Sequence, residues 1–109
     1  MPIVICVLAI LFGLLHVIAA ATRLTSRDAA VRGLSVAMLC GGVCVAAIAV
    51  AHLAGSNPGW MDALGVATGC LLICVPAYEN GRRSGDLHPS HHIVRWAIAV
   101  LLAAGIAIW

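Results

Sequence analysis

The sequence predicts an all-α polytopic integral membrane protein, with four transmembrane helices in a compact antiparallel bundle. The chain of 109 residues is 63% hydrophobic and only 9% charged, whereas a soluble domain is about 25% charged. A water-soluble fold of this size has too little interior to bury so many apolar side chains. Four apolar segments are also long enough, at about 20 residues each, to cross a hydrocarbon core of about 30 Å.

Turn-forming residues separate the four apolar segments and set the predicted boundaries. Asn57-Pro58-Gly59 interrupts the chain once, and Gly85 and Pro89 interrupt it again. Backbone polar groups cannot stay unpaired in lipid, so each segment is expected to be helical. We expect one transmembrane domain over residues 1–109, with spans at about 2–22, 31–54, 60–78 and 92–109. Pro76 is expected to kink or end the third helix.

The positions of the basic residues predict an orientation. All six are arginines, and they flank the first and third connections, whereas the second connection and both ends carry none: Arg23, Arg27, Arg32, Arg82, Arg83 and Arg95. The positive-inside rule places these arginines in the cytoplasm and both termini outside. We therefore predict a multi-pass protein of the cell membrane. The abundance of Ala, Gly and Val, with no Lys among the basic residues, indicates a GC-rich genome, and we expect a bacterial inner membrane.

Small residues recur along three spans at alternating steps of three and four, the spacing of one helix face. Transmembrane helices pack closely where small residues let their backbones approach. The pattern predicts a left-handed bundle in which spans two and three form an antiparallel hairpin. The predicted packing residues are Gly13 and His16 in the first span, Gly33, Ala37, Cys40, Cys44 and Ala47 in the second, and Ala63, Ala67, Cys70 and Cys74 in the third.

Four cysteines among these positions allow a second interpretation. Cys40 and Cys44 are one turn apart, as are Cys70 and Cys74, so an antiparallel hairpin places four thiols at one interface. Soft thiolates bind copper(I) or zinc, which makes these residues candidate metal ligands. Cysteine is also a small buried apolar residue, and a thiol deep in lipid is inert. We therefore favour packing over metal binding or redox chemistry.

Histidines supply the remaining candidate site residues. His16 is the one ionisable side chain well inside the first span, and polar groups inside a membrane are often functional. Its simpler interpretation is a neutral imidazole bonded across a helix interface, to Ser35 or to a backbone carbonyl. His16 paired with His91 or His92 is the candidate for bis-histidine haem binding, and His88 belongs to a candidate surface metal cluster. We expect no resident cofactor, with haem and metal kept as alternatives.

Several function classes are disfavoured by what the sequence lacks. No carboxylate lies near the centre of a span, whereas ion-coupled carriers usually use one. No nucleophile elbow, phosphate loop, dinucleotide fingerprint or zinc-protease helix is present, and the connections are too short for a catalytic domain. The net charge of +2 is too small for a nucleic-acid surface. We therefore expect a protein that is not an enzyme and does not bind nucleic acid.

Three functions remain open. The first is a structural or accessory subunit of a larger membrane complex, which contacts lipid and either other membrane subunits or copies of itself. The second is a self-assembling, holin-like pore. The third is a small carrier, or a metal- or haem-binding membrane protein. The size and span number are similar to those of the small multidrug-resistance transporters, but the glutamate that those proteins carry in the first helix is absent, and His16 stands in the comparable region.

Overall fold

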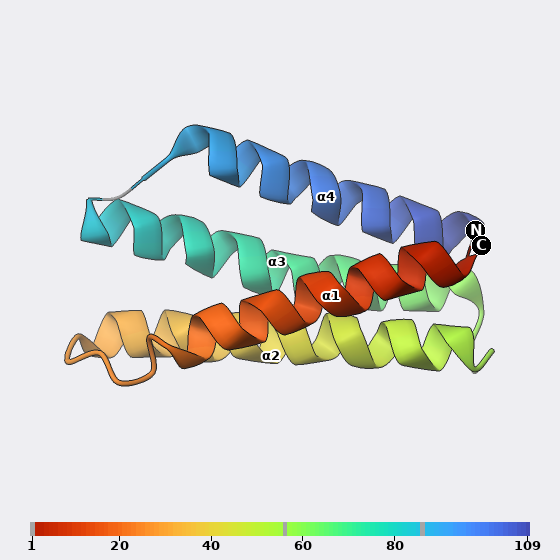
Figure 1. Cartoon of the computed structure of the whole chain (residues 1–109), viewed down its shortest axis with the longest axis horizontal. Helices are drawn as coiled ribbons and strands as arrows, with labels where there is room; N and C mark the ends of the chain where they lie inside the picture. The colour runs from red at the N-terminus through yellow and green to blue at the C-terminus, as the bar shows by residue number, and fades with distance from the viewer. Residues whose placement is uncertain (1, 56, 86) are drawn as a thin grey trace.

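Four long helices make up the computed structural model, which describes residues 2–55, 57–85 and 87–109 (Figure 1). They are α1 (Pro2–Ala21), α2 (Ala29–Leu53), α3 (Gly59–Ser84) and α4 (Pro89–Ile108). All four are long and apolar enough to cross a membrane. The shortest have 20 residues, and at about 1.5 Å per residue such a helix covers about 30 Å, the thickness of the hydrocarbon core. The predicted fold class is therefore confirmed.

The helices run antiparallel in chain order and form a compact bundle. α2 packs against both α1 and α3, and α3 also packs against α4. A smaller contact between α1 and α4 closes the ring, and Figure 1 shows α4 leaning away from α1 toward its N-terminal end. The α1–α2 and α3–α4 connections, which the arginines flank, lie at one end of the bundle, and the two termini lie together at the other.

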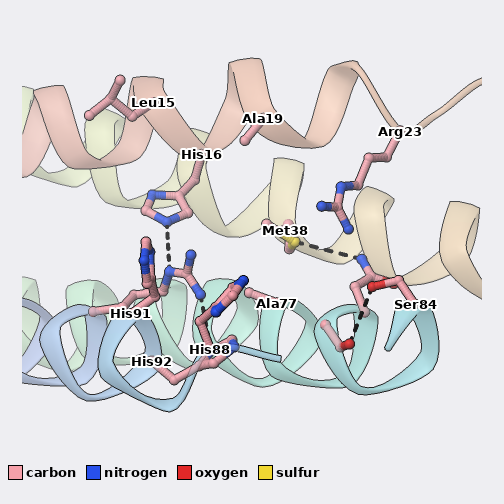
Figure 2. A pocket seen from close by; sticks show the side chains of 13 residues that line it. Leu15, His16, Ala19, Arg23, Met38, Ala77, Ser84, His88, His91 and His92 are labelled. Atoms are coloured by element: carbon pink, nitrogen blue, oxygen red, sulfur yellow. Dashed lines mark hydrogen bonds between the residues drawn. The ribbon is translucent and has the colours of Figure 1, made fainter. Parts of the chain in front are cut away.

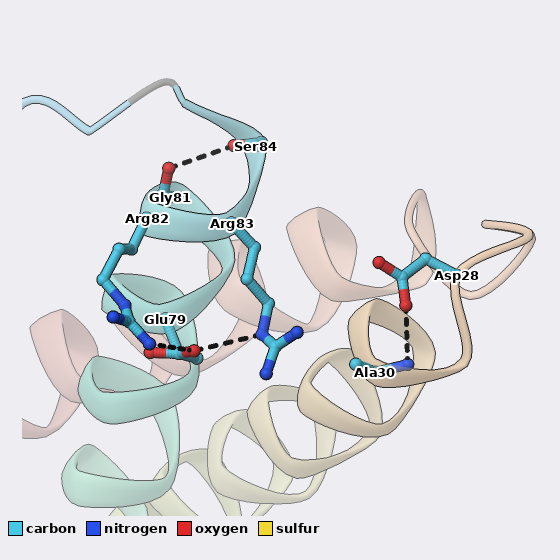
Figure 3. Close-up of polar contacts among 7 residues, drawn as sticks. All are labelled: Asp28, Ala30, Glu79, Gly81, Arg82, Arg83 and Ser84. Atoms are coloured by element: carbon cyan, nitrogen blue, oxygen red, sulfur yellow. Dashed lines mark hydrogen bonds and ion pairs between the residues drawn. The ribbon is translucent and has the colours of Figure 1, made fainter.

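The ends of α2 and α4 follow local capping rules. Asp28 precedes α2, and its carboxylate accepts a hydrogen bond of 2.9 Å from the Ala30 backbone N–H (Figure 3), which satisfies one of the unpaired donors of the first turn. α4 begins at Pro89, three residues earlier than predicted. Proline suits the first turn of a helix because it lacks an N–H that would have no partner there.

α3 is longer than the sequence predicted, since Pro76 does not end it. The helix continues six residues beyond the predicted end at residue 78, to Ser84. Membrane helices tolerate an internal proline when neighbouring groups compensate for the lost hydrogen bond. Glu79 also pairs with Arg82 at 2.8 Å and with Arg83 at 3.0 Å (Figure 3), a spacing that favours helix. The helix stops at Gly85, whose φ of +71° is the left-handed conformation of a helix C-cap.

Facing glycines bring three helices into backbone contact. A Cβ built on Gly42 of α2 would lie 2.6 Å from the carbonyl oxygen of Gly13 in α1. A Cβ built on Gly41 would likewise lie 2.6 Å from the carbonyl oxygen of Gly69 in α3. Around these contacts the bundle is filled by apolar side chains, among them Val45, Val66, Ile73 and Ile106, which are fully buried or nearly so.

The predicted packing face matches α1 and α3 better than α2. Gly13, Cys70 and Cys74 are buried, and His16, Ala63 and Ala67 are half-buried. On α2, however, Gly33, Cys40 and Ala47 are exposed, and Ala37 and Cys44 are only half-buried. The sequence pattern assumed one partner for α2, but α2 lies between α1 and α3. Its buried surface is therefore centred between the two contacts, on Ser35, Met38, Gly41, Gly42, Val45 and Ala49.

Candidate functional site

A polar cavity of about 450 Å³ opens at the end of the bundle that carries the arginines (Figure 2). It lies where α4 leans away from α1, so residues from all four helices contribute to its wall. The floor and sides include the apolar side chains of Leu15, Ala19, Met38 and Ala77. The polar part of the lining consists of His16, Arg23, Asn80, Ser84, His88, His91, His92 and Arg95.

His16 connects α1 to α4 through this cavity. Its Nδ1 lies 2.7 Å from the carbonyl oxygen of Phe12, one turn earlier in α1. A carbonyl can only accept, so Nδ1 carries the proton and Nε2 is the acceptor. Nε2 receives a hydrogen bond of 3.2 Å from Arg95 Nε. The backbone carbonyl that His16 binds belongs to its own helix, whereas the bond across a helix interface is made to Arg95 and not to Ser35, whose buried hydroxyl has no partner among the described residues.

Arg95 lies in the second turn of α4 and faces the other cavity residues. Besides its bond to His16, its NH1 lies 3.2 Å from Nδ1 of His92, which must act as acceptor because a guanidinium only donates. Both partners of Arg95 are imidazoles. Neither Arg95 nor Arg23 forms an ion pair with any carboxylate that the structure describes. The described part of the cavity wall thus holds two guanidinium groups and no carboxylate.

Asn80 supplies a buried polar group to the same cavity. Its residue is only 2% exposed. The side-chain Nδ2 makes a long contact of 3.9 Å to Met38 Sδ, which is a weak acceptor. Oδ1 has no hydrogen-bond partner among the described residues. A buried amide oxygen without a partner is costly, so a donor that reached this oxygen from the cavity would stabilise the site.

The structure brings together the histidines that the sequence proposed as a haem or metal site. His16, His88, His91 and His92 all line the cavity. The guanidinium of Arg95, however, binds both His16 Nε2 and His92 Nδ1. A cation placed between these two imidazoles would face the positive charge of Arg95. Among the residues outside positions 1, 56 and 86, no group of three or more metal-ligating side chains is arranged to hold a metal ion.

The four middle cysteines do not form one cluster. Cys70 and Cys74 are buried and Cys44 is half-buried, but Cys40 is exposed on the outer side of α2. The Cys44 thiol makes a long contact of 3.9 Å to the carbonyl oxygen of Gly65 in α3. Cys44 therefore belongs to the α2–α3 contact, as the packing interpretation expected, whereas Cys40 does not.

A polar contact at the opposite end of the bundle escaped the sequence analysis. Asp62 is 3% exposed, and its Oδ2 lies 2.7 Å from Nδ1 of His52, while Oδ1 accepts a hydrogen bond of 3.2 Å from Asn57. These bonds tie the end of α2 to the start of α3. The sequence does indicate this contact, because the connection between α2 and α3 is short. A tight turn places the last residues of one helix beside the first residues of the next.

The outward face of α2 differs from those of α1 and α3. Its exposed positions recur at steps of three and four, and they alternate between small residues and valine: Gly33, Val36, Cys40, Val43, Ala47 and Val50. We call this row the α2 seam.

Comparison of the chain with protein-family models, with curated proteins and with solved structures gave no match. The four long, apolar helices define the protein as a four-helix membrane protein, and the cavity and the α2 seam are its two candidate functional surfaces.

Proposed function

We propose that the protein is a non-catalytic subunit of a larger membrane complex, and that the α2 seam packs against a transmembrane helix of a partner subunit. The single observation that carries this proposal is the composition of the seam. Small residues stand seven positions apart at Gly33, Cys40 and Ala47, and the valines between them are also seven apart. A heptad spacing of this kind suits the left-handed crossing of two helices.

The helices α1 and α3 present a different surface to the lipid. On α1 the exposed residues include Leu8, Leu11 and Leu15, and on α3 they include Leu64 and Leu71. Large flexible side chains suit contact with lipid tails, which offer no directional partner. The small residues of the α2 seam allow a neighbouring backbone to approach closely, and close packing is what holds helices together in a membrane. The contrast between these faces favours a protein contact at α2.

The holin-like alternative requires several copies of the chain to assemble. The centre of the bundle is filled by Val45, Val66 and Ile73, each 0% exposed, so a channel would have to form between chains.

The orientation of the chain in the membrane is part of the same proposal. Both arginine-rich connections lie at one end, and the positive-inside rule favours the cytoplasm for that end and the outside for the termini. We propose a bacterial inner membrane as the location.

Site-specific photo-cross-linking in cells tests the proposal. A benzophenone amino acid replaces Val43 at the middle of the α2 seam, and the matched control replaces Leu71 on the outer face of α3. The two positions are equally exposed, at 52% and 51%. We expect a discrete adduct from position 43, with mass spectrometry placing the cross-link in a transmembrane segment of a different membrane protein. Position 71 should give no such adduct.

A second variant shows whether the adduct depends on seam packing. Cys40→Leu introduces a large side chain into the seam and should abolish the adduct from position 43, because the partner backbone can no longer approach. An adduct of twice the chain's mass would instead mean self-association, and would overturn the subunit proposal in favour of a self-assembled structure. Equal labelling from positions 43 and 71 would show that both simply face lipid, and would also overturn it.

A further inference from the structure

We propose that the cavity at the arginine-bearing end is a binding site for a hydroxyl-bearing phosphate ester, such as the headgroup of phosphatidylglycerol or a soluble glycerol phosphate. Three features of the cavity lead to this ligand class. They are the charge of its wall, the unpartnered amide of Asn80 and its position in the bundle. The inference is independent of the α2 seam, which lies on the outer face of the helix bundle.

The charge of the wall favours an anion. Arg23 and Arg95 line the cavity and have no carboxylate partner in the described part of the chain. Arg95 is half-buried in the second turn of α4, and a buried charge is costly unless a partner compensates it. Guanidinium groups are the side chains best matched to phosphate, since they bind its oxygens with parallel N–H donors. Arg95 uses Nε and NH1 on His16 and His92, which leaves its NH2 for a phosphate oxygen.

The two arginines approach from different elements. Figure 2 shows Arg23 extending from the end of α1 toward the cavity, on the opposite side of Met38 from His16. Arg95 approaches from α4 and is held by His16 of α1. Two donors on separate helices can surround one anion, whereas an anion on a flat basic surface meets them from one side only. Binding would therefore also draw α4 and the end of α1 together.

Asn80 indicates that the ligand carries a hydrogen-bond donor as well as a phosphate. Its Oδ1 is buried and lacks a partner, and a phosphate diester anion can only accept. A hydroxyl on the esterified alcohol donates to this oxygen, so the chemistry of the wall favours glycerol or another polyol over a simple phosphate. The cavity of about 450 Å³ is within the usual range for small-molecule sites, about 300–1,000 Å³.

The position of the cavity is compatible with either source of such a ligand. It is lined by residues near the ends of α1, α3 and α4, which places it at the level of the lipid headgroups. The opening faces the polar end of the bundle, where a soluble ester can also enter. The experiment therefore needs one arm for lipid and one for a soluble compound.

The test uses the full-length protein purified in detergent. Native mass spectrometry measures retention of dioleoyl phosphatidylglycerol, of phosphatidylmethanol, which lacks the free hydroxyls, and of phosphatidylcholine. Isothermal titration with sn-glycerol 3-phosphate is the soluble arm. We expect saturable binding of phosphatidylglycerol or of glycerol phosphate, and the arm that responds identifies the source. Absence of saturable binding in both arms would overturn the proposal.

Two arginine variants separate a built site from general basicity. Arg95→Gln should weaken binding about tenfold or more, the effect expected for loss of a charge-assisted hydrogen bond. Arg83→Gln is the matched control, because it removes the same charge from the same end but lies outside the cavity and pairs with Glu79. If both variants weaken binding equally, the site is only a charged surface. Arg23→Gln, at an exposed position after α1, replaces Arg95→Gln if that variant does not fold.

Asn80→Leu tests the hydroxyl contact. We expect this variant to retain phosphatidylglycerol and phosphatidylmethanol equally, whereas the unaltered protein should prefer phosphatidylglycerol. If the preference survives in Asn80→Leu, the amide does not receive the ligand hydroxyl, and that part of the proposal is wrong.

Discussion

Two identical substitutions on α2, Gly42→Ala and Gly33→Ala, should have opposite effects on stability. Gly42 faces α1, where an added Cβ would lie 2.6 Å from the carbonyl oxygen of Gly13 and 2.9 Å from a methyl carbon of Val17. An ordinary carbon–oxygen contact is about 3.3–3.6 Å, so the two helices must separate by about 0.7–1.0 Å. At Gly33 an added Cβ meets no atom within 4 Å, and no such separation is needed.

The expected magnitudes follow from this geometry. A gap of about 0.5–1 Å removes a quarter to a half of each dispersion contact across it, and overpacking of a tight core costs about 1–3 kcal/mol. Replacing a helical glycine by alanine returns about 0.5–1 kcal/mol at most. Gly42→Ala should therefore destabilise the bundle by about 1–2 kcal/mol, whereas Gly33→Ala should leave its stability unchanged or slightly raised.

The assay is reversible unfolding of the purified protein in mixed micelles with increasing sodium dodecyl sulfate, followed by circular dichroism and by intrinsic tryptophan fluorescence. The free energy of unfolding comes from the transition of each variant. Gly13→Ala should behave like Gly42→Ala, because its Cβ would lie 2.5 Å from the carbonyl oxygen of Gly42. If Gly42→Ala were as stable as Gly33→Ala, the close approach of α1 and α2 would not exist.

Two further predictions concern the polar contacts. Asp62→Leu removes the acceptor of His52 and Asn57 near the membrane edge. Hydrogen bonds inside membrane proteins contribute about 0.6 kcal/mol on average and up to about 1.7, so we expect the free energy of unfolding to fall by about 1–2 kcal/mol in the same assay. An unchanged transition would contradict the contact. Glu79→Gln should leave the unfolding transition unchanged. Its pairs with Arg82 and Arg83 are exposed to water, and such pairs contribute little to stability. A clear shift would show that these pairs hold the end of α3.

The number and direction of the helices could be predicted because they depend on local properties. Each span is a long apolar segment, and lipid leaves helix as the structure that pairs its backbone groups. The end of α3 was misplaced because the predicted boundary followed the end of the apolar segment at Tyr78, and a helix can continue into the polar residues beyond it. In the bundle the helix continues to Ser84 and stops at the left-handed Gly85.

The candidate sites were predicted only in part. Histidines His16, His91 and His92 were expected at similar depth, and they do line one cavity. The role of Arg95 between them was missed, because Arg95 was considered with the other arginines as a residue that sets the orientation. Whether a side chain at the end of a span turns toward lipid or toward the bundle depends on the rotation of the helix about its axis, which a short polar segment does not specify.

The sequence by itself determined that the chain is a four-helix membrane protein whose arginines gather at one end, because these properties follow from the order of apolar and charged residues along the chain. Tertiary structure decided which face of α2 is buried, and that Arg23, Asn80 and Arg95 line one cavity. The physical reason is that small residues on α2 suit close contact on more than one face. Only the combined packing of α1 and α3 against α2 selects the face carrying Gly41 and Gly42, and leaves Gly33, Cys40 and Ala47 exposed.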